Sequence, residues 1–169
     1  MNWLRTLRLA VVVITTGCFA LPAWSQAQDE TAAATQTLHD YYRAFSTLDL
    51  QGALAYYHEP VMFITTQNVI AAATRSEAAP RVTGLFESLK AQGYGRSELA
   101  DLRIKQVSAG LVVASGIAVR YKADGQELGR MGVTYVLRKT SEGWKLAVLV
   151  SQDPGTALRL DCPPPVASG

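Results

Sequence analysis

Two histidines and the tyrosines of the first predicted helix are the residues of this sequence best suited to acid–base chemistry. His58 stands next to Glu59, and such a pair at the mouth of a pocket can exchange protons near neutral pH. His39 stands next to Asp40, but neighbours on a helix do not face each other, so we interpret this pair as helix surface. The candidates for an acid or base are therefore His58, with a rim or capping role as the alternative, and Tyr42.

Arg120 indicates a second kind of chemistry, the binding of an anion. Residues 111–139 predict two strands joined at a tight turn, because Asp-Gly tolerates the positive φ angles of that turn. Counting outward from the turn sets small residues against large ones in four pairs: Arg120 with Gly129, Ala118 with Met131, Gly116 with Val133 and Ala114 with Tyr135. Such a face is suited to receive a helix or a ligand. Arg120 would then anchor a carboxylate, unless it extends to water or pairs with Glu127.

These residues predict one mainly apolar cavity for a small apolar or carboxylated ligand. Its expected lining residues come from helices and strands alike: Tyr42, Met62, Ile64, Phe86, Arg120, Met131 and Gln152. For Met62, Phe86 and Met131 the alternative is ordinary core packing.

Several other chemistries lack their motifs. The sequence has no His/Cys cluster or two-histidine helix for a metal, no Gly-x-Ser-x-Gly elbow and no glycine-rich phosphate loop, so we expect neither a metal nor a cofactor. Gly93 to Ser97 is interpreted as a helix-to-strand connection.

Residues 1–25 predict a cleaved signal peptide. Arg5 and Arg8 precede an apolar run from Leu9 to Leu21, and Ala-Trp-Ser at 23–25 is a small-x-small cleavage site. The run is shorter than the ~20 residues that a spanning helix needs. We therefore expect a periplasmic or secreted protein cleaved near Ser25. Lipid anchoring at Cys18 is disfavoured, because the residues before it fit the lipoprotein motif poorly.

The mature chain should have no general affinity for nucleic acid or membrane. Loss of the two leader arginines takes the formal charge from +2 to zero, and non-specific attraction needs clustered positive charge. Cys162 would then be the only cysteine, which rules out an internal disulfide and leaves a free thiol or an intermolecular bridge.

Three helices and a short hairpin should precede the main strands. Leu38, Tyr41, Tyr42, Phe45 and Leu48 recur at helical spacing, and a helix from about 77 to 92, with Pro80 in its first turn, carries Val82, Leu85, Phe86 and Leu89. Between them, Asp49 should cap a short helix that ends at His58-Glu59-Pro60. Residues 61–65 and 69–73 predict the hairpin.

Four antiparallel strands should follow, near 97–107, 111–122, 127–139 and 144–153. Helices and strands segregated in this way predict an α+β domain over 35–154, flanked by a flexible lead at 26–34 and a disordered tail at 155–169. If the loop near 141–143 has an even number of residues, alternate residues of the last strand lie on the core face: Trp144, Leu146, Val148, Val150 and Gln152. A one-residue slip would reverse that strand.

The pattern resembles the nuclear transport factor 2-like superfamily, which includes ketosteroid isomerase, scytalone dehydratase and SnoaL-type cyclases. The resemblance covers about residues 31–154 and rests on three segments: the first helix, Asp49 with 54–63, and the closing Gly-Trp-Lys-Leu strand that ends at Asp153-Pro154. It implies a cone-shaped, strongly curved, mostly antiparallel sheet with three helices packed on its concave face. It also implies a pocket in the cone and a homodimer formed through the outer sheet face.

The chemistry implied by the resemblance is matched only in part. Ketosteroid isomerase-like members place a carboxylate base about where this chain has Ile64. We therefore expect an exported small-molecule-binding domain. One alternative is a SnoaL-like, dehydratase or isomerase enzyme that uses His58 or Tyr42; another is a dimerising interaction module without a ligand.

Overall fold

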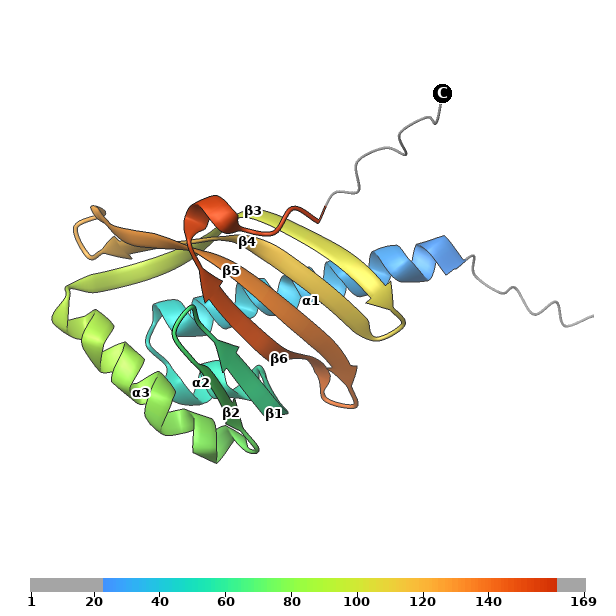
Figure 1. Ribbon diagram of the computed structural model, residues 1–169, viewed down its shortest axis with the longest axis horizontal. Helices are drawn as coiled ribbons and strands as arrows, with labels where there is room; N and C mark the ends of the chain where they lie inside the picture. The colour runs from blue at the N-terminus through green and yellow to red at the C-terminus, as the bar shows by residue number, and fades with distance from the viewer. Residues whose placement is uncertain (1–22, 161–169) are drawn as a thin grey trace, which may run out of the picture.

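The computed structural model describes residues 23–160, and its central element is one six-stranded sheet (Figure 1). In chain order the strands are β1 (Tyr57–Ile64), β2 (Val69–Ala72), β3 (Tyr94–Ser108), β4 (Leu111–Lys122), β5 (Glu127–Thr140) and β6 (Gly143–Gln152). The spatial order is β2-β1-β6-β5-β4-β3, and only the β1–β6 pair is parallel. The predicted α+β class and mostly antiparallel sheet are confirmed.

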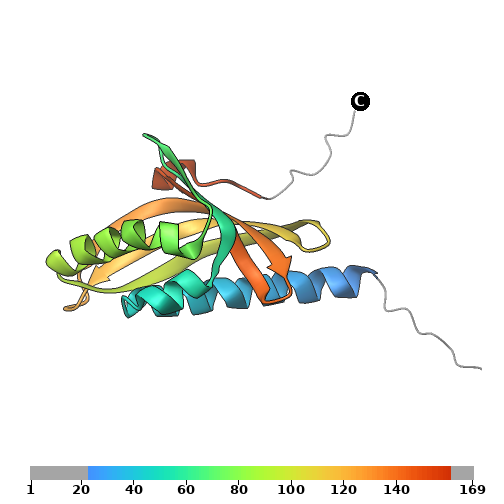
Figure 2. The ribbon, with the colours of Figure 1, turned by 90° about the horizontal axis from the view of Figure 1, so that it is seen from below.

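Three helices lie against the sheet, α1 (Ala23–Ser46), α2 (Leu50–Ala55) and α3 (Arg75–Ala91), and a short 3₁₀ turn, η1 (Pro154–Thr156), follows β6. Figure 2 shows α1 running along one side of the curved sheet, with the segment after β6 on the other side. The core between helices and sheet contains fully buried aliphatic side chains from both layers: Leu38, Val61, Val82, Leu89, Val112, Leu137 and Leu146. No helix within residues 23–160 has the length and apolar character needed to cross a membrane.

The β4–β5 hairpin has the predicted register from Arg120 inward, but its turn differs from the predicted one. Of the Asp-Gly pair only Gly125 has a positive φ, the backbone N–H of Lys122 donates to the backbone oxygen of Gln126, and the register shifts between Arg120 and Tyr121. Gly125 adopts a φ of 88°, which a residue without a side chain reaches without strain. All four predicted cross-strand pairs are present. The small hairpin is also confirmed, since β1 and β2 pair antiparallel from Val61–Ala72 to Ile64–Val69.

Helix α1 begins earlier than the sequence indicated. Residues 26–34, expected as a flexible lead, are helical. The carboxylate of Glu30 accepts hydrogen bonds from the backbone N–H of Gly110 and from the side chain of Gln106, and it pairs with Lys139. These contacts tie the start of the helix to the β3–β4 turn. The Gly110 hydrogen bond and, after it, Lys139 lower the pKa of Glu30. Most of the predicted signal peptide, with Cys18, lies outside the described residues, as does Cys162.

Two other helix boundaries differ from the prediction. Helix α2 is capped by Asp49 as expected but ends at Ala55, so His58 lies in strand β1 and not in a loop. Helix α3 begins at Arg75, where Thr74 accepts a hydrogen bond from the backbone N–H of Glu77. Pro80 therefore lies inside the helix, beyond the first turn.

Strand β6 contains an irregularity that reverses its faces. Leu137 pairs with Leu146, but its neighbour Val136 pairs with Val148, so Ala147 is an extra residue. Trp144 and Leu146, before the bulge, are buried as predicted. Beyond the bulge, Leu149 and Ser151 pair with the inward-facing Tyr135 and Val133. The prediction that Val148 and Gln152 lie on the core face is wrong.

Candidate functional site

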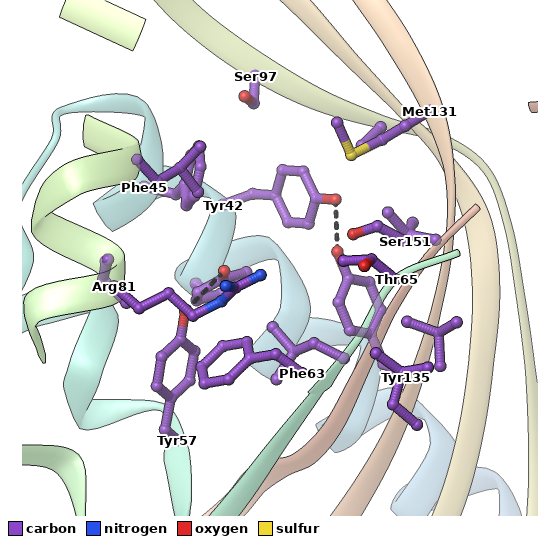
Figure 3. Close-up of a pocket in the computed structure, with 18 of the residues that line it drawn as sticks. Tyr42, Phe45, Tyr57, Phe63, Thr65, Arg81, Ser97, Met131, Tyr135 and Ser151 are labelled. Atoms are coloured by element: carbon purple, nitrogen blue, oxygen red, sulfur yellow. Dashed lines mark hydrogen bonds between the residues drawn. The ribbon is translucent and has the colours of Figure 1, made fainter. Parts of the chain in front are cut away.

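A chamber of about 330 Å³ lies between the helices and the concave face of the sheet (Figure 3). Aromatic rings contribute much of its wall: Tyr41, Tyr42, Phe45, Tyr57, Phe63 and Tyr135. The aliphatic and sulfur-containing part comes from Ile64, Val82, Leu85, Ala118, Met131, Val133, Leu149 and Val150. Its polar groups are Thr65, Ser97, Ser151, Arg81 and Arg120. A volume of this size falls at the lower end of the range of ~300–1,000 Å³ found for small-molecule sites.

Four tyrosine hydroxyls form two hydrogen-bonded pairs at the chamber wall. The hydroxyls of Tyr42 and Tyr135 are 2.7 Å apart, and those of Tyr41 and Tyr57 are 3.2 Å apart. Figure 3 shows the Tyr42 and Tyr135 hydroxyls meeting inside the chamber. Burial raises the pKa of all four phenols, in the case of Tyr57 to about 12. The phenols are therefore protonated near neutral pH, where they can donate hydrogen bonds but cannot act as bases.

Two arginines give the chamber its charge. The guanidinium of Arg81 lies 5.2 Å from the ring centre of Phe63, and that of Arg120 lies 5.8 Å from the ring centre of Phe45. One nitrogen of Arg120 also lies 3.9 Å from the sulfur of Met131. Among the described residues, no carboxylate forms an ion pair with either arginine, and the chamber lining contains no Asp or Glu. Glu127, a predicted alternative partner of Arg120, instead pairs with Arg130.

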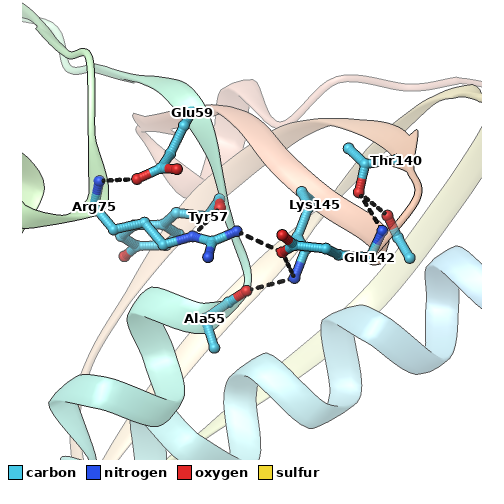
Figure 4. Close-up of polar contacts among 8 residues, drawn as sticks. Ala55, Tyr57, Glu59, Arg75, Thr140, Glu142 and Lys145 are labelled. Atoms are coloured by element: carbon cyan, nitrogen blue, oxygen red, sulfur yellow. Dashed lines mark hydrogen bonds and ion pairs between the residues drawn. The ribbon is translucent and has the colours of Figure 1, made fainter.

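A polar network holds the elements behind the aromatic wall (Figure 4). The Arg75 side chain donates to the backbone oxygen of Tyr57 at 3.0 Å and to Glu142 at 3.1 Å. Lys145 donates to the backbone oxygen of Ala55 at 2.8 Å and lies 3.5 Å from the same carboxylate. These cations, Arg75 first, lower the pKa of Glu142. The network joins the start of α3 to β1 and to the β5–β6 turn, and so fixes the strand that carries Tyr57.

Four of the seven predicted cavity residues meet in the chamber: Tyr42, Ile64, Arg120 and Met131. The other three lie elsewhere. Met62 is 36% exposed, because its neighbours Val61 and Phe63 take the inward positions of β1. Phe86 is buried behind the chamber wall and packs edge-on against Phe45, with 5.0 Å between the two ring centres. The amide of Gln152 donates to the backbone oxygen of Thr156 at 2.9 Å, outside the chamber.

His58 does not reach the chamber. Its Nδ1 lies 3.0 Å from the backbone oxygen of Pro60. The adjacent carboxylate of Glu59 accepts a hydrogen bond from the backbone N–H of Arg75 at 2.7 Å (Figure 4), so the two side chains have separate structural partners. Within residues 23–160, no three His, Cys, Asp or Glu side chains gather as metal ligands.

The sequence-based site omitted several lining residues. Tyr57 lies where the sequence predicts the end of the short helix, and strict alternation along the last strand would place Ser151 on the outer face, because it does not include the β6 bulge. Arg81 was detectable, since it lies four residues before Leu85 and hence on the same side of α3. Tyr135 lies on the predicted inner face, opposite Ala114, but is not among the predicted lining residues.

Comparison with known proteins identifies the family. The chain matches the family described as NTF2-like protein (DUF6841) over residues 29–154. No curated protein matches it.

Three solved structures illustrate the shared fold. An NTF2-like protein with a cystatin-like fold from Novosphingobium aromaticivorans is 15% identical, with a TM-score of 0.64 over 77% of this chain and 85% of that protein. A ketosteroid isomerase-like protein from Erwinia carotovora atroseptica is 20% identical, with a TM-score of 0.54 over 73% of this chain and 95% of that protein. A Mycobacterium tuberculosis protein of unknown function is 21% identical, with a TM-score of 0.60 over 83% of each chain. At these identities the likeness shows the fold alone, and the family match shows that this chain belongs to the NTF2-like protein family DUF6841.

Proposed function

We propose that this chain is a binding domain for a small, mainly apolar or aromatic molecule that carries a carboxylate. The observation that supports this most directly is the pairing of Arg81 and Arg120 with a chamber that has no acidic lining residue among those described. Arg120 is half-buried and Arg81 is exposed. A partly desolvated cation such as Arg120 is stabilised by an anionic partner, and no carboxylate among the described lining residues supplies one. A ligand carboxylate would fill that role.

The chamber can position such a ligand through its rings and hydroxyls. Each arginine lies near one aromatic face, with Arg81 by Phe63 and Arg120 by Phe45. A guanidinium held against a ring keeps N–H groups for an anion, and charge-assisted hydrogen bonds are the stronger kind. The rings would cover the apolar body of the ligand. The Tyr42–Tyr135 pair offers one further hydroxyl proton, because the two hydroxyls use only one between them.

Binding explains the chamber better than either alternative. A module without a ligand would fill this space with its own side chains, whereas the chamber has a volume of about 330 Å³. A proton-transfer enzyme needs a base. The carboxylates and His58 are absent from the described lining, and the raised pKa of Tyr42 keeps its phenol protonated.

The proposal is tested by measuring the affinity of 2-naphthoate and of its neutral amide by calorimetry. We expect the carboxylate to bind more tightly than the amide. Arg120→Met should weaken naphthoate binding by about 10- to 100-fold, the effect of losing a charged hydrogen bond. Arg138→Met, on the exposed part of β5, is the matched control and should leave the affinity unchanged. Equal affinities for acid and amide, or no effect of Arg120→Met, would contradict the proposal.

We also propose that the protein is exported and begins at about Gln26 after cleavage. The support is the charged and apolar pattern of residues 5–25 together with the Ala-Trp-Ser site. Intact mass measurement of the protein from a periplasmic fraction checks this. A mass that retains residues 1–25, or one that includes a lipid on Cys18, would contradict it.

A further inference from the structure

A second hollow, of about 460 Å³, adjoins the chamber; it is shallower and more open to solvent, and most of its lining side chains are polar. We call it the outer groove. It shares four lining residues with the chamber: Thr65, Arg81, Met131 and Ser151. Its remaining lining comes from the β1–β2 turn and the end of β6: Thr66, Gln67, Asn68, Gln152 and Asp153. Every lining residue of the outer groove except Met131 has a polar side chain that can form hydrogen bonds. A ligand in the chamber therefore has an open surface with polar side chains beside it.

The backbone around the outer groove is held in place by its own hydrogen bonds. The hydroxyl of Thr65 accepts from the backbone N–H groups of Gln67 and Asn68 and donates to the side-chain oxygen of Asn68 at 3.1 Å. On the opposite wall, the hydroxyl of Thr156 donates to the backbone oxygen of Asp153 at 2.9 Å. A pre-organised wall loses less conformational entropy when a ligand binds.

Two side chains of the outer groove remain available for a ligand. Neither the amide of Gln67 nor the carboxylate of Asp153 makes a hydrogen bond or ion pair with another described residue. An amide both donates and accepts, and a carboxylate accepts from hydroxyl groups. A neutral amide together with a carboxylate suits a ligand that carries hydroxyl groups, whereas Asp153 would repel a second carboxylate on the ligand.

We propose that the ligand has two parts, an aromatic carboxylate in the chamber and a hydroxylated, sugar-like extension in the outer groove. This inference rests on the proposed function and specifies its ligand class. Arg81 lines both spaces, whereas Arg120 lines the chamber alone. The carboxylate therefore points inward to Arg120, and the extension leaves past Arg81 between Gln67 and Asp153.

The test compares 6-hydroxy-2-naphthoate with its 6-O-glucoside, which carries the sugar opposite the carboxylate. The wild-type protein should bind the glucoside more tightly. Gln67→Ala and Asp153→Ala should each weaken binding of the glucoside by about 3- to 10-fold, the effect of losing one hydrogen bond, and leave binding of the hydroxynaphthoate unchanged. Gln51→Ala is the matched control, on the exposed surface of α2 and outside both spaces.

The outcomes separate this inference from the proposed function. If the hydroxynaphthoate binds in an Arg120-dependent way but the glucoside binds no better, the two-part ligand is wrong and the carboxylate site stands. Unchanged glucoside affinity in both groove variants also overturns the inference. If neither compound depends on Arg120, the proposed function itself has failed.

Discussion

The four buried phenols of the chamber make the free energy of unfolding depend on pH in alkaline solution. Burial raises the pKa of Tyr57 from its ordinary value of 10.0 to about 12, and raises those of Tyr41, Tyr42 and Tyr135 as well. Above about pH 10 the unfolded chain loses protons that the folded chain retains. Below that pH these phenols therefore cause no pH dependence in the free energy of unfolding. As the pH rises further, the free energy of unfolding falls.

A urea titration between about pH 9 and pH 11 measures this dependence. Each phenol contributes a slope of at most about 1.4 kcal/mol per pH unit. Tyr57→Phe should therefore show a shallower fall than wild type, whatever its stability at neutral pH. The slope reports on ionisation of the Tyr41–Tyr57 pair, because loss of packing shifts the whole curve, whereas removal of the Tyr57 hydroxyl also removes part of the cause of the raised pKa of Tyr41. Equal slopes in the two proteins would show that Tyr57 is not held protonated.

Residue positions in the candidate site were predictable from the sequence only in part. Arg120 and Met131 were placed correctly although the turn is longer than predicted, because the register shift between Arg120 and Tyr121 offsets the extra residue of the turn. Met62 was predicted on the wrong face of β1. Its neighbours Val61 and Phe63 are also apolar, so the sequence allows either face to be the inner one, and in the structure these two neighbours face the core.

On the scale of elements, Gly116 shows how the curvature of the sheet is accommodated. The sequence suggested that this small residue leaves room for helices or a ligand, but it does not line the chamber. A Cβ at Gly116 would lie 2.8 Å from the backbone oxygen of Ala100. There β3 is irregular, with a shift in register between Ala100 and Arg103 and a φ of 50° at Asp101. The missing side chain lets the two strands approach at this irregularity.

We expect Gly116→Ala to lower the free energy of unfolding by about 1–3 kcal/mol, because neighbouring backbone must move to admit the methyl group. Gly129→Ala is the matched control in the adjacent strand, where a Cβ meets nothing within 4 Å. Its effect should stay within about 0.5 kcal/mol. Urea unfolding of both variants checks the prediction. Equal stabilities would show that the β3 irregularity does not depend on Gly116.

The β6 bulge marks the limit of sequence-based prediction for elements. Strand existence, order and type followed from alternation and turn residues, and these predictions are confirmed for the main strands. Ala147 has no local signature of a bulge, because alanine fits either face of a strand. Its effect is global, since it moves Leu149 and Ser151 to the chamber. The departure from alternation depends on how β6 pairs with both β1 and β5, which no single segment encodes.

For the whole molecule, the outer face of the sheet carries an apolar row that the helices do not cover. Val113, Val136, Val148 and Met62 are successive cross-strand partners from β4 to β1. The first three are partly exposed and Met62 is 36% exposed. An apolar row of this length across a sheet is typical of a surface that binds another protein. We propose that a second copy of this chain covers it, as the family resemblance implied.

The oligomeric state of the purified protein tests this proposal. Sedimentation analysis at micromolar concentration should show a homodimer. Met62→Lys should shift it to monomer, because the substitution would bury a charge at the contact, while circular dichroism should show an intact fold, since the side chain is exposed in the single copy. Gln51→Lys adds the same charge on exposed α2 and should remain dimeric. A wild-type monomer, or a Met62→Lys dimer, would contradict the proposal, because in either case the apolar row would not lie at the interface.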